Sequence, residues 1–360
     1  MNRRDFLKTA LLSGGILLLP GFAAPGRART HTGSWRPAYF DLEEKGRFAQ
    51  RIRDAYAMFE KCELCPRRCG VNRAKGETGV CRATDQVVVY SRQPHFGEEL
   101  PLVGRHGSGT IFFSNCNLRC VFCQNWPIAH EGRGTTVSDE MLAEMMIQIQ
   151  NMGCHNINVV TPTHVMPNIL NATRIAMKKG LRLPICYNTG GYERTEAVRM
   201  LDGIVDIYLP DLKFMDPGNA ARFAGDARDY PENARAAIIE MNRQVGDTRV
   251  NPQGVATRGL MIRHLVMPNR VAGTREFVQW VSENLPPETY INIMSQYRVE
   301  HRAFEYPEIA RAITPEEYVE AIDWAKSAGL SNLDARSASQ YESMRRRMGS
   351  GEEAVRSIFR

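Results

Sequence analysis

Short apolar runs alternate with longer amphipathic stretches from residue 107 onward. Each run ends in polar residues or glycine, as a buried strand does. The six expected strands cover residues 110–113, 157–160, 183–187, 204–209, 260–266 and 290–294. The helices expected between them cover residues 138–152, 167–179, 193–201, 232–245 and 274–283. Six strand–helix alternations predict an α/β fold with a parallel sheet and covering helices.

The regions on either side of these alternations have different patterns. An amphipathic stretch at 42–59 precedes a region rich in loops and cysteines, and a further helix is expected at 315–328 with Thr314 as its N-cap. The arginine-rich residues 331–360 are expected to form a helical or mobile tail. The predicted regions are a leader (1–28), a lead segment (29–58), a four-cysteine metal-binding module (59–106), the α/β domain (107–302) and a C-terminal helical segment (303–360).

Residues 1–28 have the pattern of an export signal. Arg3 and Arg4 precede an apolar stretch at 11–24, which glycines and a proline interrupt, and small residues follow. The segment closely resembles a twin-arginine signal, and a membrane anchor is the alternative, although the stretch is shorter than the ~20 residues of a span. We therefore expect export by the twin-arginine machinery, a periplasmic or extracytoplasmic location and no membrane span after processing. Action in the cytoplasm before export is the other possibility.

The net charge of +6 argues little for a nucleic-acid partner. Four basic residues and one acidic residue lie in 1–28, so half of the excess leaves with the leader. The rest of the chain is close to neutral, and we expect no nucleic-acid binding. No G-x-G-x-x-G, G-x-x-x-x-G-K or H-E-x-x-H pattern occurs, which argues against a dinucleotide fold, a phosphate loop and a metalloprotease.

Three cysteines directly after the first expected strand form the strongest constellation. Cys116, Cys120 and Cys123 are spaced x3 and x2, so one loop can bring three thiolates to one metal centre. Three ligands leave one iron of a four-iron cluster without a protein ligand and open to substrate. A catalytic zinc site likewise keeps one coordination position open. A structural zinc with a remote fourth ligand, or simply buried cysteines, are the alternatives.

A second cysteine set lies nearer the N-terminus. It consists of Cys62, Cys65, Cys69 and Cys81. Four thiolates saturate a metal, so we expect a structural zinc or a second [4Fe-4S] cluster, with two disulfides as the alternative in an exported protein. Six basic residues against two acidic ones within 61–82 favour thiolates, and Gly76 and Gly79 suit the turns that return Cys81 to the site. Cys154 and Cys186 are expected to be buried structural thiols.

The carboxyl ends of the expected strands are polar. In a (β/α) barrel chemistry gathers at these ends, and here they carry hydroxyls, amides and charges that suit a zwitterionic, ribose-bearing ligand. His164 and His264 also lie there, and each can be a catalyst, an orienting residue or a core residue.

The C-x3-C-x2-C motif, with Phe122 before its last cysteine, resembles the radical S-adenosylmethionine superfamily. Further segments are similar to a subgroup related to the pyruvate formate-lyase activating enzyme. These segments are 62–73, 76–81, 156–164, 187–192, 206–213, 263–268 and 295–297.

The resemblance implies a partial (β/α)6 TIM-like barrel with a small N-terminal four-cysteine module. It implies an enzyme with a [4Fe-4S] cluster on Cys116, Cys120 and Cys123, which reductively cleaves S-adenosylmethionine. The resulting 5′-deoxyadenosyl radical abstracts hydrogen from a protein, peptide or small-molecule substrate, and the electron comes from a reductant such as a ferredoxin or flavodoxin. A non-catalytic exported iron–sulfur electron carrier or metal-binding scaffold is the alternative function.

The resemblance also implies contacts to the cofactor. Asp211 and Lys213 match an Asp-x-Lys motif near the bound cofactor, although the two could also form a structural ion pair. The other implied contacts are Phe122, Asn188, Thr189, Arg263 and Tyr297. Where the superfamily often has Gly-Gly-Glu after the second strand, this chain has Thr161-Pro162-Thr163, so hydroxyls or carbonyls at Thr161 and Thr163 must serve instead.

Overall fold

The computed structural model of the protein describes residues 29–30 and 35–358. The predicted export signal at 1–28 therefore lies outside the described residues. Within the described ranges, no helix combines the length and apolar character that crossing a bilayer requires.

Six parallel strands form the centre of the molecule. They are β3 (Ser108–Phe113), β5 (Ile157–Val160), β6 (Ile185–Thr189), β7 (Ile207–Pro210), β9 (Ala256–Leu265) and β10 (Tyr290–Met294). Each pairs in parallel with the next in this order. The described strands show no pairing that joins β10 to the opposite edge, so the curved sheet is an open, partial barrel. The predicted α/β class and its six strands are confirmed.

Four strands extend this sheet that the hydrophobic pattern did not predict. β2 (Val87–His95) runs antiparallel to β3, and β4 (Thr135–Val137) runs antiparallel to β2. The short strands β1 (Arg29–Thr30) and β8 (Arg249–Val250) add to the side of β9. β2 was missed because Tyr90 and its later neighbours are exposed or half-buried, so the strand lacks a continuous apolar run.

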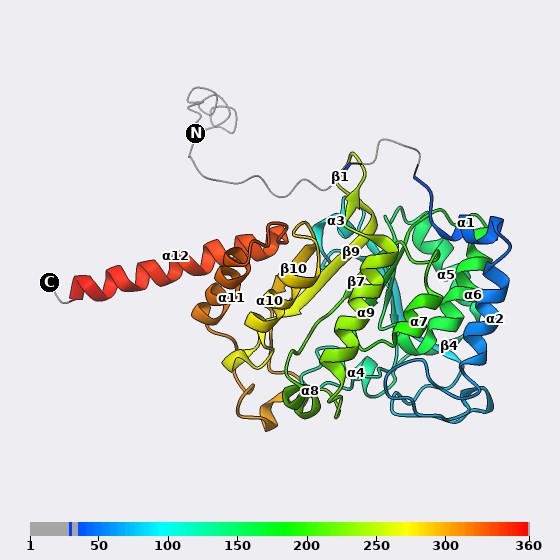
Figure 1. Ribbon diagram of the computed structural model, residues 1–360, viewed down its shortest axis with the longest axis horizontal. Coiled ribbons are helices and arrows are strands. Elements are labelled where there is room, and N and C mark those ends of the chain that lie inside the picture. Colours follow the sequence, from blue (N-terminus) through cyan, green and yellow to red (C-terminus); the bar gives the residue numbers. More distant parts are fainter. Residues whose placement is uncertain (1–28, 31–34, 359–360) are drawn as a thin grey trace, which may run out of the picture.

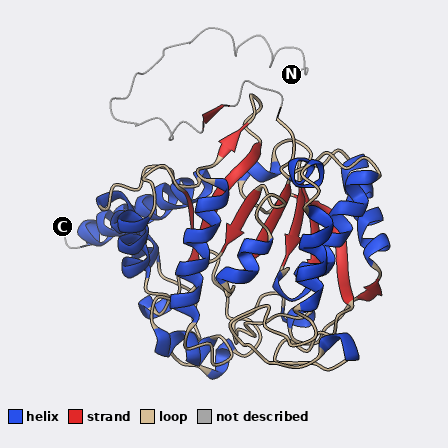
Figure 2. Cartoon of the chain, turned by 45° about the vertical axis from the view of Figure 1, so that its right-hand side comes forward, coloured by secondary structure: helices blue, strands red, loops and turns tan. Residues whose placement is uncertain are grey.

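Helices cover the outside of the strands, and loops gather at one end of the sheet (Figure 2). The helices that follow the parallel strands are α5 (Asp139–Asn151), α6 (Met166–Lys178), α7 (Thr195–Met200), α9 (Tyr230–Val245) and α10 (Thr274–Asn284). Short helices within loops are α3 (Leu100–Val103), α4 (Trp126–Ala129) and α8 (Pro217–Phe223). The single helix expected at 42–59 is instead two, α1 (Tyr39–Glu44) and α2 (Phe48–Ala57), because Gly46 adopts a left-handed φ of 66° between them.

The C-terminal segment is helical. α11 (Pro315–Ser327) begins at the predicted N-cap, where Thr314 and Glu317 form a capping box. The predicted helical or mobile tail contains α12 (Ala335–Ile358), which projects from the body of the molecule (Figure 1). The first turns of α12 pack against β10 and α11.

The apolar residues form two layers. The larger core lies between sheet and helices and contains Cys154, whereas a smaller cluster with Cys186 lies inside the barrel. Both thiols are buried and unpaired, as predicted. The inner cluster consists of Leu102, Cys186, Ile207, Leu209, Val250, Ala256, Met261 and Tyr290. The inside of the barrel is therefore apolar where this cluster lies. The polar residues inside the barrel gather at the carboxyl ends of the strands.

Candidate functional site

One cavity of about 260 Å³ opens at the carboxyl ends of the parallel strands. It is lined by most of the residues predicted for the cofactor site. These are Cys116, Cys120, Phe122, Cys123, Thr161, Asn188, Thr189, Asp211, Lys213 and Arg263. They come from the loop after β3 and from β5, β6, β7 and β9 or their ends, so the parallel order of the strands brings them together.

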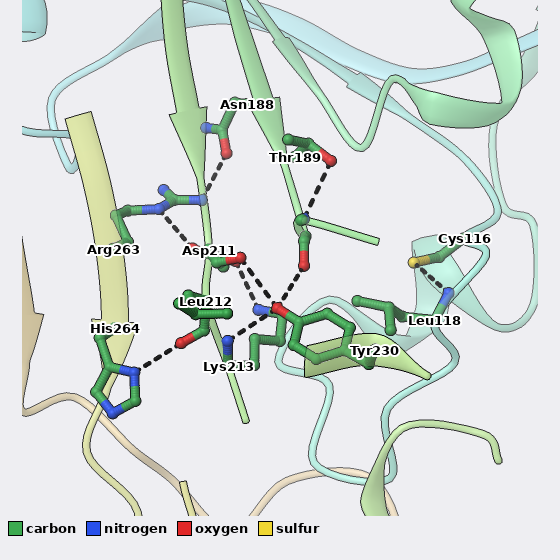
Figure 3. A network of polar contacts seen from close by, with 12 residues as sticks. Cys116, Leu118, Asn188, Thr189, Asp211, Leu212, Lys213, Tyr230, Arg263 and His264 are labelled. Carbon is green, nitrogen blue, oxygen red and sulfur yellow. Dashed lines mark hydrogen bonds and ion pairs between the residues drawn. The ribbon is translucent and has the colours of Figure 1, made fainter. Parts of the chain in front are cut away.

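The loop after β3 turns three thiols toward this cavity. Asn115 and Arg119 adopt left-handed φ values of 74° and 56°, which fold the loop back on itself. The Cys116 Sγ accepts the backbone N–H of Leu118 at 3.4 Å (Figure 3). Burial raises the pKa of Cys123 to about 12, and the nearby Cys116 adds to the shift. Thiolates this close together are stable only beside compensating positive charge, and iron supplies it.

The three thiols of this loop lie close enough together to share one metal centre. The charges of Cys116 and Cys123 act on Cys120, and the charge of Cys116 acts on Cys123. Each thiolate of a four-iron cluster binds a different iron, so three thiolates leave one iron without a protein ligand. The donor set therefore suits a cluster with one open iron.

A buried ion network forms the opposite wall. Asp211 lies between two cations: Lys213 Nζ is 2.6 Å from one carboxylate oxygen and Arg263 Nε is 2.7 Å from the other (Figure 3). Arg263 also donates to Asn188 Oδ1 at 2.6 Å. Burial opposes the ionisation of Asp211, but the charges of Arg263 and Lys213 hold its pKa below the ordinary value. Asp211 and Lys213 thus form an ion pair that also lines the cavity.

The backbone around this network is closely packed. The Tyr230 hydroxyl accepts the backbone N–H of Lys213 at 2.8 Å and lies 2.9 Å from the Gly190 carbonyl. A Cβ added to Gly191, whose φ is 82°, would lie 2.1 Å from the Asp211 carbonyl oxygen. The Gly-Gly pair after β6 therefore lets two strand ends approach each other directly beneath the cavity.

Thr161 adopts an unusual backbone conformation at the edge of the cavity. Its φ is 59°, which a β-branched residue rarely adopts. Its N–H donates to the Asn188 carbonyl at 2.9 Å, which holds the turn against the end of β6. Strain of this kind costs about 1–3 kcal/mol and is concentrated at functional sites. This strained residue directs the loop after β5 toward the cavity.

We expect Thr161→Gly to stabilise the protein by about 1 kcal/mol, because glycine adopts this φ without strain. Urea denaturation measures the change in the free energy of unfolding. Thr161→Ala is the matched control, since it removes the hydroxyl but keeps the Cβ that causes the strain. Equal stability of the glycine and alanine variants would contradict the interpretation.

Glu193 is a site residue that the sequence reasoning missed. Its carboxylate is buried and accepts the hydroxyls of Thr163 at 2.6 Å and Thr189 at 2.5 Å, so it joins the loop after β5 to the end of β6. Burial raises the pKa of Glu193 to about 7 against the effect of these hydroxyls. The sequence placed Glu193 at the start of a helix, and only its position directly after Gly190-Gly191 hinted at a link to the site.

Glu193→Gln should change how stability depends on pH. The folded pKa of Glu193 is raised, so its stabilising contribution is present below the unfolded pKa near 4.5 and is lost as the pH rises through about 7. Near pH 5 the free energy of unfolding of the variant should be close to that of the wild type. At pH 8 it should be higher by about 1–3 kcal/mol, with a higher melting temperature. Thermal melts at both pH values test this. The expectation fails if the difference is the same at pH 5 and pH 8.

Two predicted cofactor contacts do not line the cavity. Thr163 lies behind its wall and donates to Glu193. Tyr297 is buried and donates its hydroxyl to the Ile309 carbonyl at 2.7 Å, while its ring centroid lies 6.1 Å from that of Phe122. Both residues therefore support lining residues from behind.

The two histidines near the strand ends hold backbone segments together. His164 Nε2 lies 2.7 Å from the Ser114 carbonyl at the start of the cysteine loop. His264 bonds the Leu212 carbonyl and the Thr274 hydroxyl. Burial lowers the pKa of His164 to about 3 and that of His264 to about 4, so both are neutral near pH 7. Their contacts fit orienting residues and not acid–base catalysts.

The four cysteines of the N-terminal set lie close together next to this site. Cys62, Cys65 and Cys81 are buried, and none of the four is in a disulfide. Burial raises the pKa of Cys65 to about 12, and the nearby Cys81 and Cys62 add to it. A Cβ on Gly79 would lie 2.5 Å from the Cys69 Sγ, so this turn requires glycine.

Arg67 connects the two cysteine sets. It lies between Cys65 and Cys69, and its Nε donates to the Asn117 carbonyl within the other cysteine loop at 3.0 Å. Its guanidinium also donates to the Ala224 carbonyl at 3.1 Å. The two cysteine loops are therefore in direct contact.

Comparisons with known proteins identify the family of the chain. Residues 110–263 match the family model of the Radical SAM superfamily. The uncharacterized protein MJ0674 of Methanocaldococcus jannaschii is 32% identical over 290 residues, which cover 78% of each chain. The chain belongs to the radical SAM superfamily, which implies a [4Fe-4S] cluster and S-adenosylmethionine as cofactors.

Two solved structures resemble the chain more distantly. The structure of TYW1 with a lysine-pyruvate adduct bound has a TM-score of 0.40 at 10% identity, covering 61% of this chain and 73% of TYW1. HydG, a maturase of the [FeFe]-hydrogenase, has a TM-score of 0.45 at 9% identity. The match covers 85% of this chain but only 61% of HydG.

Proposed function

We propose that the protein uses Cys116, Cys120 and Cys123 to hold the [4Fe-4S] cluster and acts as an activating-enzyme-like radical enzyme. When bound, the reduced cluster supplies the electron that cleaves S-adenosylmethionine to methionine and a 5′-deoxyadenosyl radical. This radical takes a hydrogen atom from a protein, peptide or small-molecule substrate. One observation supports this assignment. The three thiols and a buried network of cations and a carboxylate line the same cavity.

Different side chains of the cavity suit different parts of S-adenosylmethionine. The cationic groups of Lys213 and Arg263 suit the carboxylate of the methionine moiety, and the amide and hydroxyl of Asn188 and Thr189 suit its polar groups. Phe122 lines the same cavity and packs against Phe214 with ring centroids 5.9 Å apart. Its apolar face excludes water beside the thiols.

Anaerobic reconstitution tests this function. Protein loaded with iron and sulfide, reduced and mixed with S-adenosylmethionine should release 5′-deoxyadenosine, measured by liquid chromatography and mass spectrometry. A loaded protein that shows redox activity but releases none would instead be a non-catalytic electron carrier or scaffold. The cavity beside the thiols favours the enzyme, since a carrier needs no ligand space at its cluster.

We further propose that Cys62, Cys65, Cys69 and Cys81 hold a second [4Fe-4S] cluster and not a zinc ion. Two observations support it: the four thiols are close enough for their charges to interact and none is in a disulfide, and their loop contacts the other cysteine loop through Arg67. Reconstituted protein should then contain about eight irons, and Cys65→Ala about four. About four irons with one zinc in the wild type would contradict the proposal.

The sequence also supports a proposal about the cellular setting. We propose export of the folded protein by the twin-arginine machinery and reduction by a ferredoxin or flavodoxin. The basic residues around the four-cysteine set suit such donors, which are commonly acidic proteins. Fractionation of cells expressing the full chain, with Arg3-Arg4→Lys-Lys as control, tests the export.

A further inference from the structure

A second cavity of about 310 Å³ adjoins the first inside the barrel. The two share Arg263, Met294 and Gln296 as walls. The other side of the second cavity is formed by the loop at 97–99 and the first turns of α12. A molecule in the second cavity would therefore lie directly beside a molecule in the first.

Glu99 lines this second cavity with a buried carboxylate that has one oxygen without a hydrogen-bond partner among the described residues. Its side chain is only 2% exposed, and its Oε1 accepts the Asn292 amide at 2.8 Å. Its Oε2 is buried and receives no hydrogen bond from any described residue. An unpaired buried acceptor costs about 1–3 kcal/mol, more when charged, so this oxygen requires a donor that the chain does not supply.

The charges around Glu99 have other partners. Glu98 is 3.3 Å from Arg263 Nη1 and 3.5 Å from His95 Nδ1. Arg336, at the cavity wall, donates to the Gly97 carbonyl at 2.7 Å and to the Phe96 carbonyl at 3.1 Å, not to a carboxylate. Among the described ion pairs Glu99 has no cationic partner. Burial raises the pKa of Glu99; the charge of Arg263 opposes this shift, and the neighbouring Glu98 adds to it.

We propose that the second cavity binds the substrate of the radical reaction through a protonated primary amine that donates to Glu99. The inference rests on the proposed function, because it assigns the substrate of that same site. An ammonium group supplies the hydrogen bond that Glu99 Oε2 lacks within the described chain and places a positive charge in contact with the carboxylate. Charge-assisted hydrogen bonds of this kind are the strong ones. The amine belongs to a small molecule or to a peptide, and the two sources share this chemistry.

The position of Glu99 also determines which part of the substrate reacts. With its ammonium at Glu99, the substrate extends past Met294 and Gln296 toward the first cavity. The carbon that loses hydrogen then lies in the first cavity, and the amine lies in the second, on the other side of Met294 and Gln296. The amine is a recognition group, and Glu99 is a specificity residue.

Calorimetric titration tests the inference. The probes are n-pentylamine and its neutral analogue 1-pentanol, followed by Nα-acetyl-lysine methylamide and a lysine-containing pentapeptide, which separate the two sources. The amine should bind the reconstituted full chain, and the alcohol should bind at least about tenfold more weakly. Glu99→Gln should weaken amine binding at least about tenfold, whereas Glu283→Gln, an exposed carboxylate on α10, should leave it unchanged.

A second variant guards against misfolding of Glu99→Gln. Gln340 is exposed on α12 at the edge of the cavity, so Gln340→Trp narrows the opening without disturbing the core and should also weaken amine binding. Equal binding of amine and alcohol, or full binding by both variants, overturns the inference. The same titration with Cys120→Ala keeps the two proposals apart, because amine binding there should persist although the radical reaction is lost.

Discussion

Cys120→Ala should abolish the release of 5′-deoxyadenosine, with a loss of at least about a hundredfold. Even residues that only support a metal ligand change activity by 10–100-fold, and Cys120 is the most deeply buried thiol of its set, at 8% exposed. Lys213 and Asp211 lie close enough for their charges to act on it. Its loss removes one of the three cysteines of the loop after β3. The assay is the anaerobic reduction with S-adenosylmethionine.

The matched control is Cys154→Ala. Cys154 is also buried, but it precedes the amino end of β5, whereas the cysteine loop follows the carboxyl end of the parallel strand β3. It should retain iron content and 5′-deoxyadenosine release. The four-cysteine set should remain loaded in Cys120→Ala, so its iron content should fall to about half of the wild-type value. Undiminished 5′-deoxyadenosine from Cys120→Ala would refute the ligand assignment.

The parallel strands could be predicted because they are buried on both faces. β5 and β7 therefore stand out as apolar runs. β2 could not be found in this way, since it lies toward the edge of the sheet with residues such as Tyr90 exposed. The break between α1 and α2 depends on one left-handed glycine, Gly46, within an otherwise continuous amphipathic pattern.

The sequence could predict a site residue only where it belongs to a local motif or directly follows an expected strand. The cysteine motif is local, and the residues at strand ends, such as Asn188 and Asp211, follow from the common direction of parallel strands. Glu98 and Glu99 do not follow an expected strand, and they reach the inside of the barrel because their loop lies beside β10. Burial and unpaired oxygens are tertiary properties, so sequence reasoning had no means of selecting these two among the acidic residues.

Arg263→Met should lower the free energy of unfolding by about 3–5 kcal/mol. The Arg263 guanidinium bonds Asp211, Glu98 and the Asn188 amide inside the barrel. Methionine fills a similar volume but leaves Glu98 and one oxygen of Asp211 without that cation, and removing one partner of a buried charge pair has a cost of this size. Urea denaturation of the protein before iron loading measures it.

Arg302→Met provides the matched control, because Arg302 pairs with Glu305 at the surface, where the two side chains are 55% and 39% exposed. Such a pair contributes about 0–1 kcal/mol. Arg263→Lys should be intermediate, since lysine keeps the charge but cannot bond three groups with one planar fork. If Arg263→Met and Arg302→Met lose the same stability, the network does not stabilise the barrel. A large loss confined to Arg263 would instead show that one guanidinium holds together the wall that both cavities share.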